Sequence, residues 1–61
     1  MKNLKGKLVL ITGGARGLGY AHATAFAREG ANLILVDVNQ EQVGESAAKL
    51  SGEFGIQAEG L

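Results

Sequence analysis

The hydrophobic residues of this chain come in two short unbroken runs, each followed by a polar or glycine-rich segment. Leu8 to Ile11 and Leu33 to Val36 contain no polar residue, a pattern typical of strands buried on both faces of a parallel sheet. We therefore predict strands over residues 7–12 and 32–37. A third strand is predicted over residues 56–61, after a glycine-containing break.

Two helices are predicted between these strands, over residues 17–29 and from residue 40 onward. The first ends before Gly30, which suits a left-handed C-terminal position. Its predicted inward stripe is Leu18, Ala21, His22, Ala25 and Phe26. The second begins after the N-cap Asn39, with Gln42 completing a capping box. Its predicted inward stripe is Val43, Ala47 and Leu50, and its predicted breakers are Ser51, Gly52 and Gly55.

The predicted order of elements is strand, helix, strand, helix, strand. This order indicates an α/β fold, the N-terminal β-α-β-α-β portion of a Rossmann-like, doubly wound parallel sheet. Right-handed crossovers place the strands in the spatial order third, second, first, which leaves the first strand as an unpaired apolar edge. We therefore predict that residues 1–61 are the N-terminal part of one dinucleotide-binding domain whose sheet is meant to continue.

Composition narrows the classes of partner. Six Lys and Arg balance six Asp and Glu among the 61 residues, so no net charge attracts nucleic acid or an anionic membrane. The chain has no cysteine and one histidine, which excludes a disulfide framework and a His/Cys metal site. Its apolar runs are too short to span a bilayer or to form a signal-peptide core. We predict a cytoplasmic protein that binds neither nucleic acid nor membrane.

A glycine-rich turn with the sequence TGGARGLG directly follows the first predicted strand. Glycines allow the backbone to approach a ligand closely, and the free N–H groups of the following helix favour an anion such as phosphate. A P-loop would require lysine after Gly19, where Tyr20 stands. The fingerprint GxGxxG starting at Gly17 would require glycine or alanine at position 22, which is His22. Neither pattern fits.

The pattern that fits is TGxxxGxG, spelled by Thr12, Gly13, Gly17 and Gly19. With a strand before it, a helix after it and Asp37 at the end of the second strand, the chain resembles the short-chain dehydrogenase/reductase family. The resemblance extends over essentially the whole chain, but over only the opening quarter or so of a usual member. It implies an NAD(P)-dependent oxidoreductase that transfers hydride to or from an alcohol or ketone, with this chain as its dinucleotide-binding segment.

The same resemblance implies a set of cofactor contacts. The expected contacts are Gly13, Ala15, Arg16, Gly17, Leu18, Gly19, Asp37 and Val38. Within this set, the backbone of Gly13, Gly17 and Leu18 is expected to line the pyrophosphate. Gly19 is expected to allow close packing of helix on strand, and Val38 to border the adenine.

Asp37 is the candidate ribose ligand. It follows Gly19 by 18 residues, close to the interval of about 20 at which a ribose-binding carboxylate is expected. A 2′-phosphate beside it would meet a like charge, at a cost on the order of a few kcal/mol. The carboxylate therefore favours NAD over NADP. Arg16 favours the opposite, because a basic residue in this turn often pairs with the 2′-phosphate in related family members.

No catalytic residue and no metal ligand is assigned in this chain. The family's catalytic tyrosine is followed four residues later by lysine, whereas Thr24 stands four residues after Tyr20. We therefore predict that the chain alone is inactive and is a fragment of an enzyme. For the full-length protein, a homo-oligomer is expected. The alternative is a non-catalytic dinucleotide-binding module or an inactive truncated gene product, which the coding sequence after residue 61 would distinguish.

Overall fold

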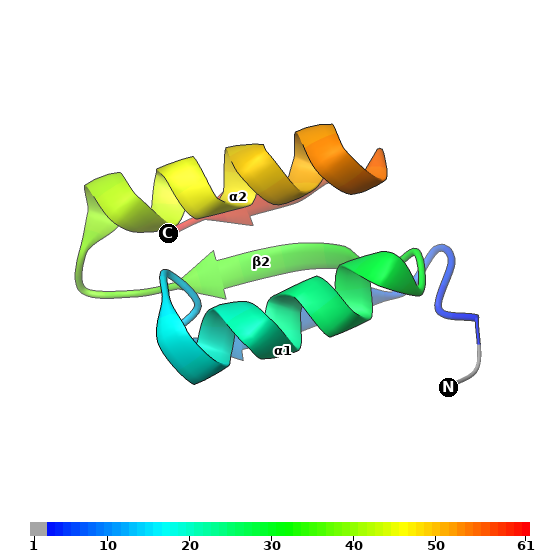
Figure 1. Ribbon diagram of the computed structural model, residues 1–61, viewed down its shortest axis with the longest axis horizontal. Coiled ribbons are helices and arrows are strands. Elements are labelled where there is room, and N and C mark those ends of the chain that lie inside the picture. Colours follow the sequence, from blue (N-terminus) through cyan, green and yellow to red (C-terminus); the bar gives the residue numbers. More distant parts are fainter. Residues whose placement is uncertain (1–2) are drawn as a thin grey trace.

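The computed structural model describes residues 3–61, which form a three-stranded sheet and two helices (Figure 1). The elements are β1 (Leu8–Thr12), α1 (Gly17–Arg28), β2 (Asn32–Val36), α2 (Gln40–Phe54) and β3 (Ala58–Gly60). Both strand pairs are parallel and β2 is the central strand. The predicted α/β order and the predicted spatial order of the strands are confirmed.

Only one face of the sheet is covered. Leu33 and Leu35 of β2 are buried against the helices, whereas Leu8 and Leu10 of β1 are 66% and 63% exposed on the other face. In Figure 1 both helices lie in front of the fainter strands. The prediction of strands buried on both faces is therefore wrong for this chain. Successive right-handed crossovers that move in one direction across a sheet place their helices on the same side.

The face of α1 that meets the sheet differs from the predicted stripe. Ala23 and Ala27 are buried, whereas Leu18 is 73% exposed and His22 is also exposed. The buried alanines follow Gly19 at intervals of four residues, so these three small residues lie on one side of the helix. Because this side approaches the backbone closely, the rotation of α1 is set by small residues. Leu18 is turned outward, and Phe26 is only partly buried at the edge of the core.

The predicted N-cap of α2 is confirmed. The Asn39 side-chain Oδ1 accepts a hydrogen bond of 3.0 Å from the Gln42 backbone N–H. The second half of the capping box differs from the prediction, because Gln42 Oε1 accepts from the Asn39 side-chain amide at 3.4 Å. The Asn39 backbone N–H instead donates to Asp37 Oδ1 at 3.1 Å. An aspartate two residues before the N-cap thus performs part of the capping.

The inward stripe of α2 is buried as predicted, with Val43, Ala47 and Leu50 all in the core. The helix continues through two of its predicted breakers, Ser51 and Gly52, to Phe54. It ends at Gly55, whose φ of 68° is left-handed. Ser51 is compatible with the helix because its hydroxyl donates to the Ile56 carbonyl, at 2.7 Å, and anchors the chain after the helix end.

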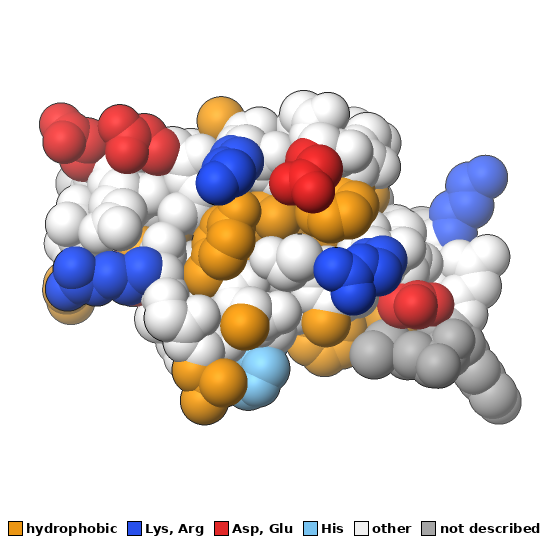
Figure 2. Space-filling model, viewed as in Figure 1, with side chains coloured by type: hydrophobic (Ala, Val, Ile, Leu, Met, Phe, Trp, Pro, Cys, Tyr) orange, Lys and Arg blue, Asp and Glu red, His pale blue; other side chains and the backbone are white. Residues whose placement is uncertain are grey.

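The helical face of the molecule has an apolar seam. Hydrophobic side chains gather between α1 and α2, with basic and acidic side chains on either side (Figure 2). Tyr20, Phe26 and Phe54 are partly buried and pack against the core. The ammonium of Lys49 on α2 lies 6.0 Å from the centre of the Tyr20 ring on α1, at the outer limit of a cation–π contact. This seam joins the two helices.

Candidate functional site

The glycine turn and the β2–α2 connection lie together at the carboxyl ends of β1 and β2. In Figure 1 the cyan turn and the yellow-green connection share the left-hand end of the molecule. The Gly13 N–H donates to the Val36 carbonyl at 2.7 Å, which fixes the start of the turn beside the end of β2. Ligands of parallel α/β sheets bind outside the carboxyl ends of the strands. This end of the molecule is therefore the candidate site.

The three family glycines of the turn have separate structural reasons. Gly13 and Gly17 have φ values of 67° and 64°, in the left-handed region that other residues rarely adopt. Gly19 has ordinary helical geometry, but a Cβ there would overlap the carbonyl oxygen of Gly13. Two glycines shape the turn and the third lets α1 approach it.

The N-terminus of α1 is open to an anion. Arg16 is the N-cap residue, with extended backbone and no side-chain capping hydrogen bond, and the first turn of the helix contains no acidic residue. The backbone N–H groups that start α1 therefore have no side chain to accept them. The positive end of the helix dipole adds to this preference for negative charge. Gly17 and Leu18, the expected pyrophosphate contacts, lie at this end.

Asp37 is held beside the turn by hydrogen bonds to the backbone. Its Oδ1 accepts from the Asn39 N–H at 3.1 Å, and its Oδ2 accepts from the Ala15 N–H at 3.2 Å. Its own backbone N–H donates to the Leu61 carbonyl at 3.2 Å, which ties its position to the end of β3. The structure thus brings together the acid and the turn that the sequence pattern singled out.

The carboxylate of Asp37 is kept ionised by its surroundings. The Asn39 N–H, followed by the Ala15 N–H, lowers the pKa of this carboxyl below its ordinary value. The nearby charge of Arg16 makes a smaller contribution in the same direction, while partial desolvation opposes it. A carboxylate with lone pairs still available can accept hydrogen bonds from sugar hydroxyls.

A shallow apolar depression of about 380 Å³ lies next to this carboxylate. It is lined by Thr12, Gly13, Val36, Asp37 and Val38. The Val38 side chain is fully exposed at its rim. An apolar surface beside a hydrogen-bonding carboxylate suits a flat ring joined to a sugar.

Arg16 is not among the residues that line this depression. Its side chain is exposed and lines a second hollow between α1 and α2, together with Tyr20, Gln42, Glu45 and Lys49 among others. Its positive charge acts on Asp37 and helps to lower the pKa of that carboxyl.

Ser46 contacts the turn and was missed by the sequence analysis. Its hydroxyl is buried and donates to the Ala15 carbonyl at 2.6 Å. Ala15 itself is buried, so both of its backbone polar groups are bonded to side chains, the N–H to Asp37 and the carbonyl to Ser46. Helical spacing in the sequence could have identified Ser46, because position 46 falls on the inward side of α2 between Val43 and Ala47. A polar residue buried there needs a hydrogen-bond partner.

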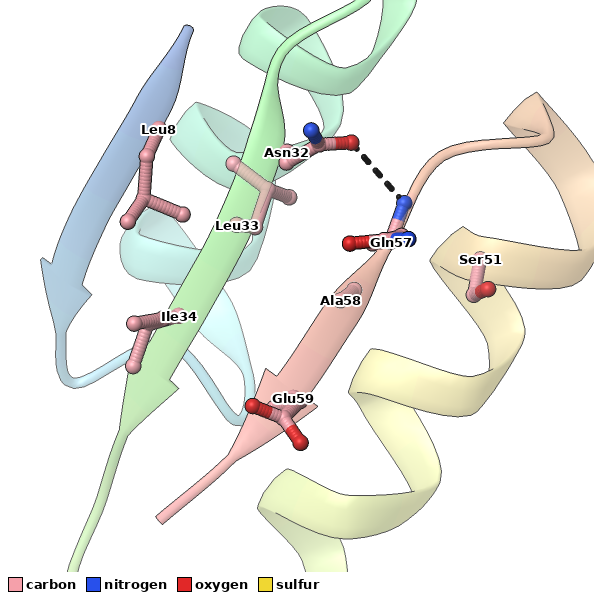
Figure 3. A pocket seen from close by; sticks show the side chains of 8 residues that line it. All are labelled: Leu8, Asn32, Leu33, Ile34, Ser51, Gln57, Ala58 and Glu59. Carbon is pink, nitrogen blue, oxygen red and sulfur yellow. Dashed lines mark hydrogen bonds between the residues drawn. The ribbon is translucent and has the colours of Figure 1, made fainter. Parts of the chain in front are cut away.

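A larger hollow lies at the opposite end of the strands (Figure 3). It includes Leu8, Asn32, Ile34 and Glu59 among its lining residues, and the Asn32 side chain accepts a hydrogen bond of 3.0 Å from the Gln57 N–H. Asn32 is the first residue of β2, whereas the candidate site lies beyond the last. This hollow is thus separate from the glycine turn, and its size does not make it the cofactor site.

Two further features are absent from the described part of the chain, a metal-binding cluster and a membrane-spanning helix. Within residues 3–61, no group of three His, Asp or Glu side chains could hold a metal ion. Neither helix in this range has the length and apolar character required to cross a membrane.

The sequence matches a known protein family over most of its length. The family model described as short chain dehydrogenase matches residues 7–61. The short chain dehydrogenase/reductase dpmpG of Macrophomina phaseolina is 56% identical over 50 residues, which are 82% of this chain and 29% of that protein. The fold is the opening unit of a Rossmann-like sheet, and the chain belongs to the short-chain dehydrogenase family.

Two solved structures superpose closely on this chain. L-sorbose reductase from Gluconobacter frateurii, complexed with NADPH and L-sorbose, matches with a TM-score of 0.91 and 36% identity over 95% of this chain and 22% of that one. A short-chain dehydrogenase from Sphingobium yanoikuyae in complex with NADPH matches with a TM-score of 0.86 and 40% identity over 90% of this chain and 22% of that one. The chain thus spans less than a third of the length of these relatives.

Proposed function

We propose that these residues form the dinucleotide-binding segment of an NAD(P)-dependent oxidoreductase that acts on an alcohol or ketone. The observation that carries the proposal is the 3.2 Å hydrogen bond from the Ala15 N–H to the Asp37 carboxylate. It joins the anion-binding turn to the sugar-binding acid in one site. When bound, the dinucleotide supplies hydride transfer, while the residues of this chain bind and orient its adenosine end.

Each part of the cofactor has a matching surface in this proposal. The uncapped N-terminus of α1, at Gly17 and Leu18, takes the pyrophosphate. The Asp37 carboxylate accepts hydrogen bonds from the adenosine ribose, and the depression beside Val38 takes the adenine ring. Gly13, Ala15, Arg16 and Gly19 belong to the same site, either by lining it or by shaping the turn.

We propose NAD as the preferred cofactor because Asp37 is ionised and occupies the position expected for the ribose ligand. A 2′-phosphate beside this carboxylate would bring like charges together. Arg16 supports the competing candidate, NADP, since its exposed guanidinium lies near enough to Asp37 to act on its charge. The two solved relatives described above, which are NADPH complexes, support the same candidate.

The test is calorimetric titration of the full-length protein with NAD, NADP and ADP-ribose. We expect all three to bind, with NAD tighter than NADP. Asp37→Ala is expected to narrow or reverse this preference by relieving the repulsion of the 2′-phosphate. Glu41→Ala is the matched control. It removes one negative charge from an exposed position at the start of α2 and leaves the glycine turn unchanged.

The outcomes separate the candidates. Tighter binding of NADP by the unchanged protein would overturn the preference for NAD but not the dinucleotide site. Absence of binding by all three compounds would overturn the site itself. Cofactor binding without any turnover of alcohols or ketones by the full-length protein would favour the non-catalytic binding module. A cytoplasmic location and a homo-oligomeric full-length protein complete the proposal.

A further inference from the structure

The structure holds Ala15 from two sides, and one of the two contacts is not explained by ligand binding. The Asp37 carboxylate accepts a hydrogen bond from the Ala15 N–H, and the Ser46 hydroxyl donates a hydrogen bond of 2.6 Å to the Ala15 carbonyl. Ser46 is 8% exposed and Ala15 is 4% exposed. A buried serine in the second turn of α2 therefore reaches a turn that lies 31 residues earlier in the chain.

We propose that Ser46 is a positioning residue that keeps the glycine turn in its dinucleotide-binding conformation before the cofactor arrives. This inference rests on the proposed function, which it deepens by naming a residue that acts through the turn and does not itself touch the cofactor.

The proposal follows from the geometry of the peptide bond. In a trans peptide the carbonyl and the following N–H point in opposite directions. Because Ser46 draws the Ala15 carbonyl toward α2, the Arg16 N–H of the same peptide unit is turned away from α2. The preceding peptide unit is held by Asp37 through the Ala15 N–H. The two peptide units that flank Ala15 are thus each fixed by a side chain from a different part of the fold.

Removal of the Ser46 hydroxyl would leave a buried carbonyl without its partner. Within residues 3–61 the structure shows no other hydrogen bond to the Ala15 oxygen. A buried unpaired carbonyl is costly, so this peptide unit would rotate part of the time to reach water. Affinity then falls in proportion to the fraction of molecules that keep the binding conformation. Saturating cofactor restores that conformation, so turnover at saturation is preserved.

The test compares two serines of α2 whose hydroxyls each donate to a backbone carbonyl, one in the glycine turn and the other just after the end of the helix. Ser46→Ala removes the bond to Ala15, and Ser51→Ala removes the 2.7 Å bond to the Ile56 carbonyl, far from the turn. Both variants are made in the full-length protein. The measurements are the Kd of NAD and of ADP-ribose by calorimetry, the KM and kcat for NAD, the urea midpoint, and amide exchange of Ala15 and Arg16.

Ser46→Ala is expected to raise the Kd and KM for NAD by roughly three- to ten-fold with little change in kcat, and to speed amide exchange in the turn. Ser51→Ala is expected to lower the urea midpoint without changing the Kd. Ser46→Thr, which keeps the hydroxyl, is expected to restore affinity. If the alanine variant does not fold, Ser46→Cys, which offers a weaker donor of similar size, should show a smaller rise in Kd.

Two results would overturn the proposal and leave the proposed function intact. One is an unchanged Kd for Ser46→Ala in a protein that binds NAD. The other is an equal rise in Kd for Ser46→Ala and Ser51→Ala, which would mean that general loss of stability explains the effect. Failure of the unchanged protein to bind NAD, NADP or ADP-ribose would instead overturn the proposed function.

Discussion

Gly19, in the first turn of α1, lies directly against the carbonyl oxygen of Gly13, and a Cβ at position 19 would overlap that oxygen. The obstructing atom belongs to the backbone of the turn, so no side-chain rotation can relieve the overlap. Any larger residue must push the helix away from the turn. This one contact therefore couples the packing of α1 to the shape of the glycine turn.

Gly19→Ala is expected to destabilise the full-length protein by at least about 1–3 kcal/mol, the usual cost of overpacking a closed contact. It should also weaken NAD binding, because the turn must shift. Gly44→Ala in α2 is the control, since a Cβ there meets nothing within 4 Å. That change should stabilise the helix by about 0.5–1 kcal/mol. Urea denaturation measures both, and equal midpoints for the two variants would contradict the close contact.

The pH dependence of stability should carry the signature of Asp37. Folding lowers the pKa of this carboxyl, chiefly through the Asn39 N–H and then the Ala15 N–H. A lowered pKa stabilises the fold at pH values above the ordinary pKa of the group, and this contribution is lost as the pH falls through the folded pKa. The stability difference between the unchanged protein and Asp37→Asn should thus be constant near neutral pH and shrink in acid.

Titration of the Asp37 carboxyl by NMR measures directly whether folding lowers its pKa. The midpoint in the folded protein should lie below the ordinary value for aspartate. A midpoint at or above that value would mean that the two backbone N–H groups do not bind the carboxylate in solution.

The N-cap of α2 should contribute to stability without affecting the cofactor. Asn39→Ala removes the oxygen that accepts from Gln42 and is expected to cost about 1 kcal/mol. The Asn39 backbone N–H still reaches Asp37, so NAD affinity should be unchanged. Gln40→Ala, at the exposed first residue of the helix, is the control and should leave the urea midpoint unchanged. A large loss of NAD affinity in Asn39→Ala would show that the cap also positions Asp37.

The uncovered face of the sheet should make the isolated 61-residue chain self-associate. Leu8 and Leu10 are exposed on edge strand β1, and exposed apolar surface of this kind favours association. The double substitution of Leu8→Lys and Leu10→Lys should reduce association in sedimentation velocity experiments. Leu18→Lys, a similarly exposed position on α1, should not. A sharp cooperative melt from a monomer of the unchanged chain would contradict this prediction.

Much of the fold was predictable from local patterns. Several correctly predicted features depend only on residues close in sequence. They are the strands, the left-handed Gly30, the Asn39 N-cap and the buried stripe of α2. The proximity of Asp37 to the glycine turn was also predictable, because the carboxyl ends of adjacent parallel strands meet at one edge of the sheet. The cofactor contacts assigned to these residues stay predictions.

Other features depended on contacts between distant segments. The inward face of α1 was wrongly predicted because apolar spacing alone favoured the side with Leu18 and His22, whereas the approach of Gly19 to Gly13 turned Ala23 and Ala27 inward. Sequence spacing does not register that contact. Packing also explains why α2 continues through Ser51 and Gly52. Burial of Leu50 in the core outweighs the weak helix propensity of these two residues.

The sequence by itself determined the order of the elements, the N-cap of α2, and the placement of a glycine turn beside a carboxylate, because these depend on periodicity and on the chemistry of single residues. Only the tertiary structure decided which face of the sheet is covered, how α1 is rotated, and that Ser46 holds Ala15. These features depend on the distance between segments far apart in the chain, and that distance follows from packing.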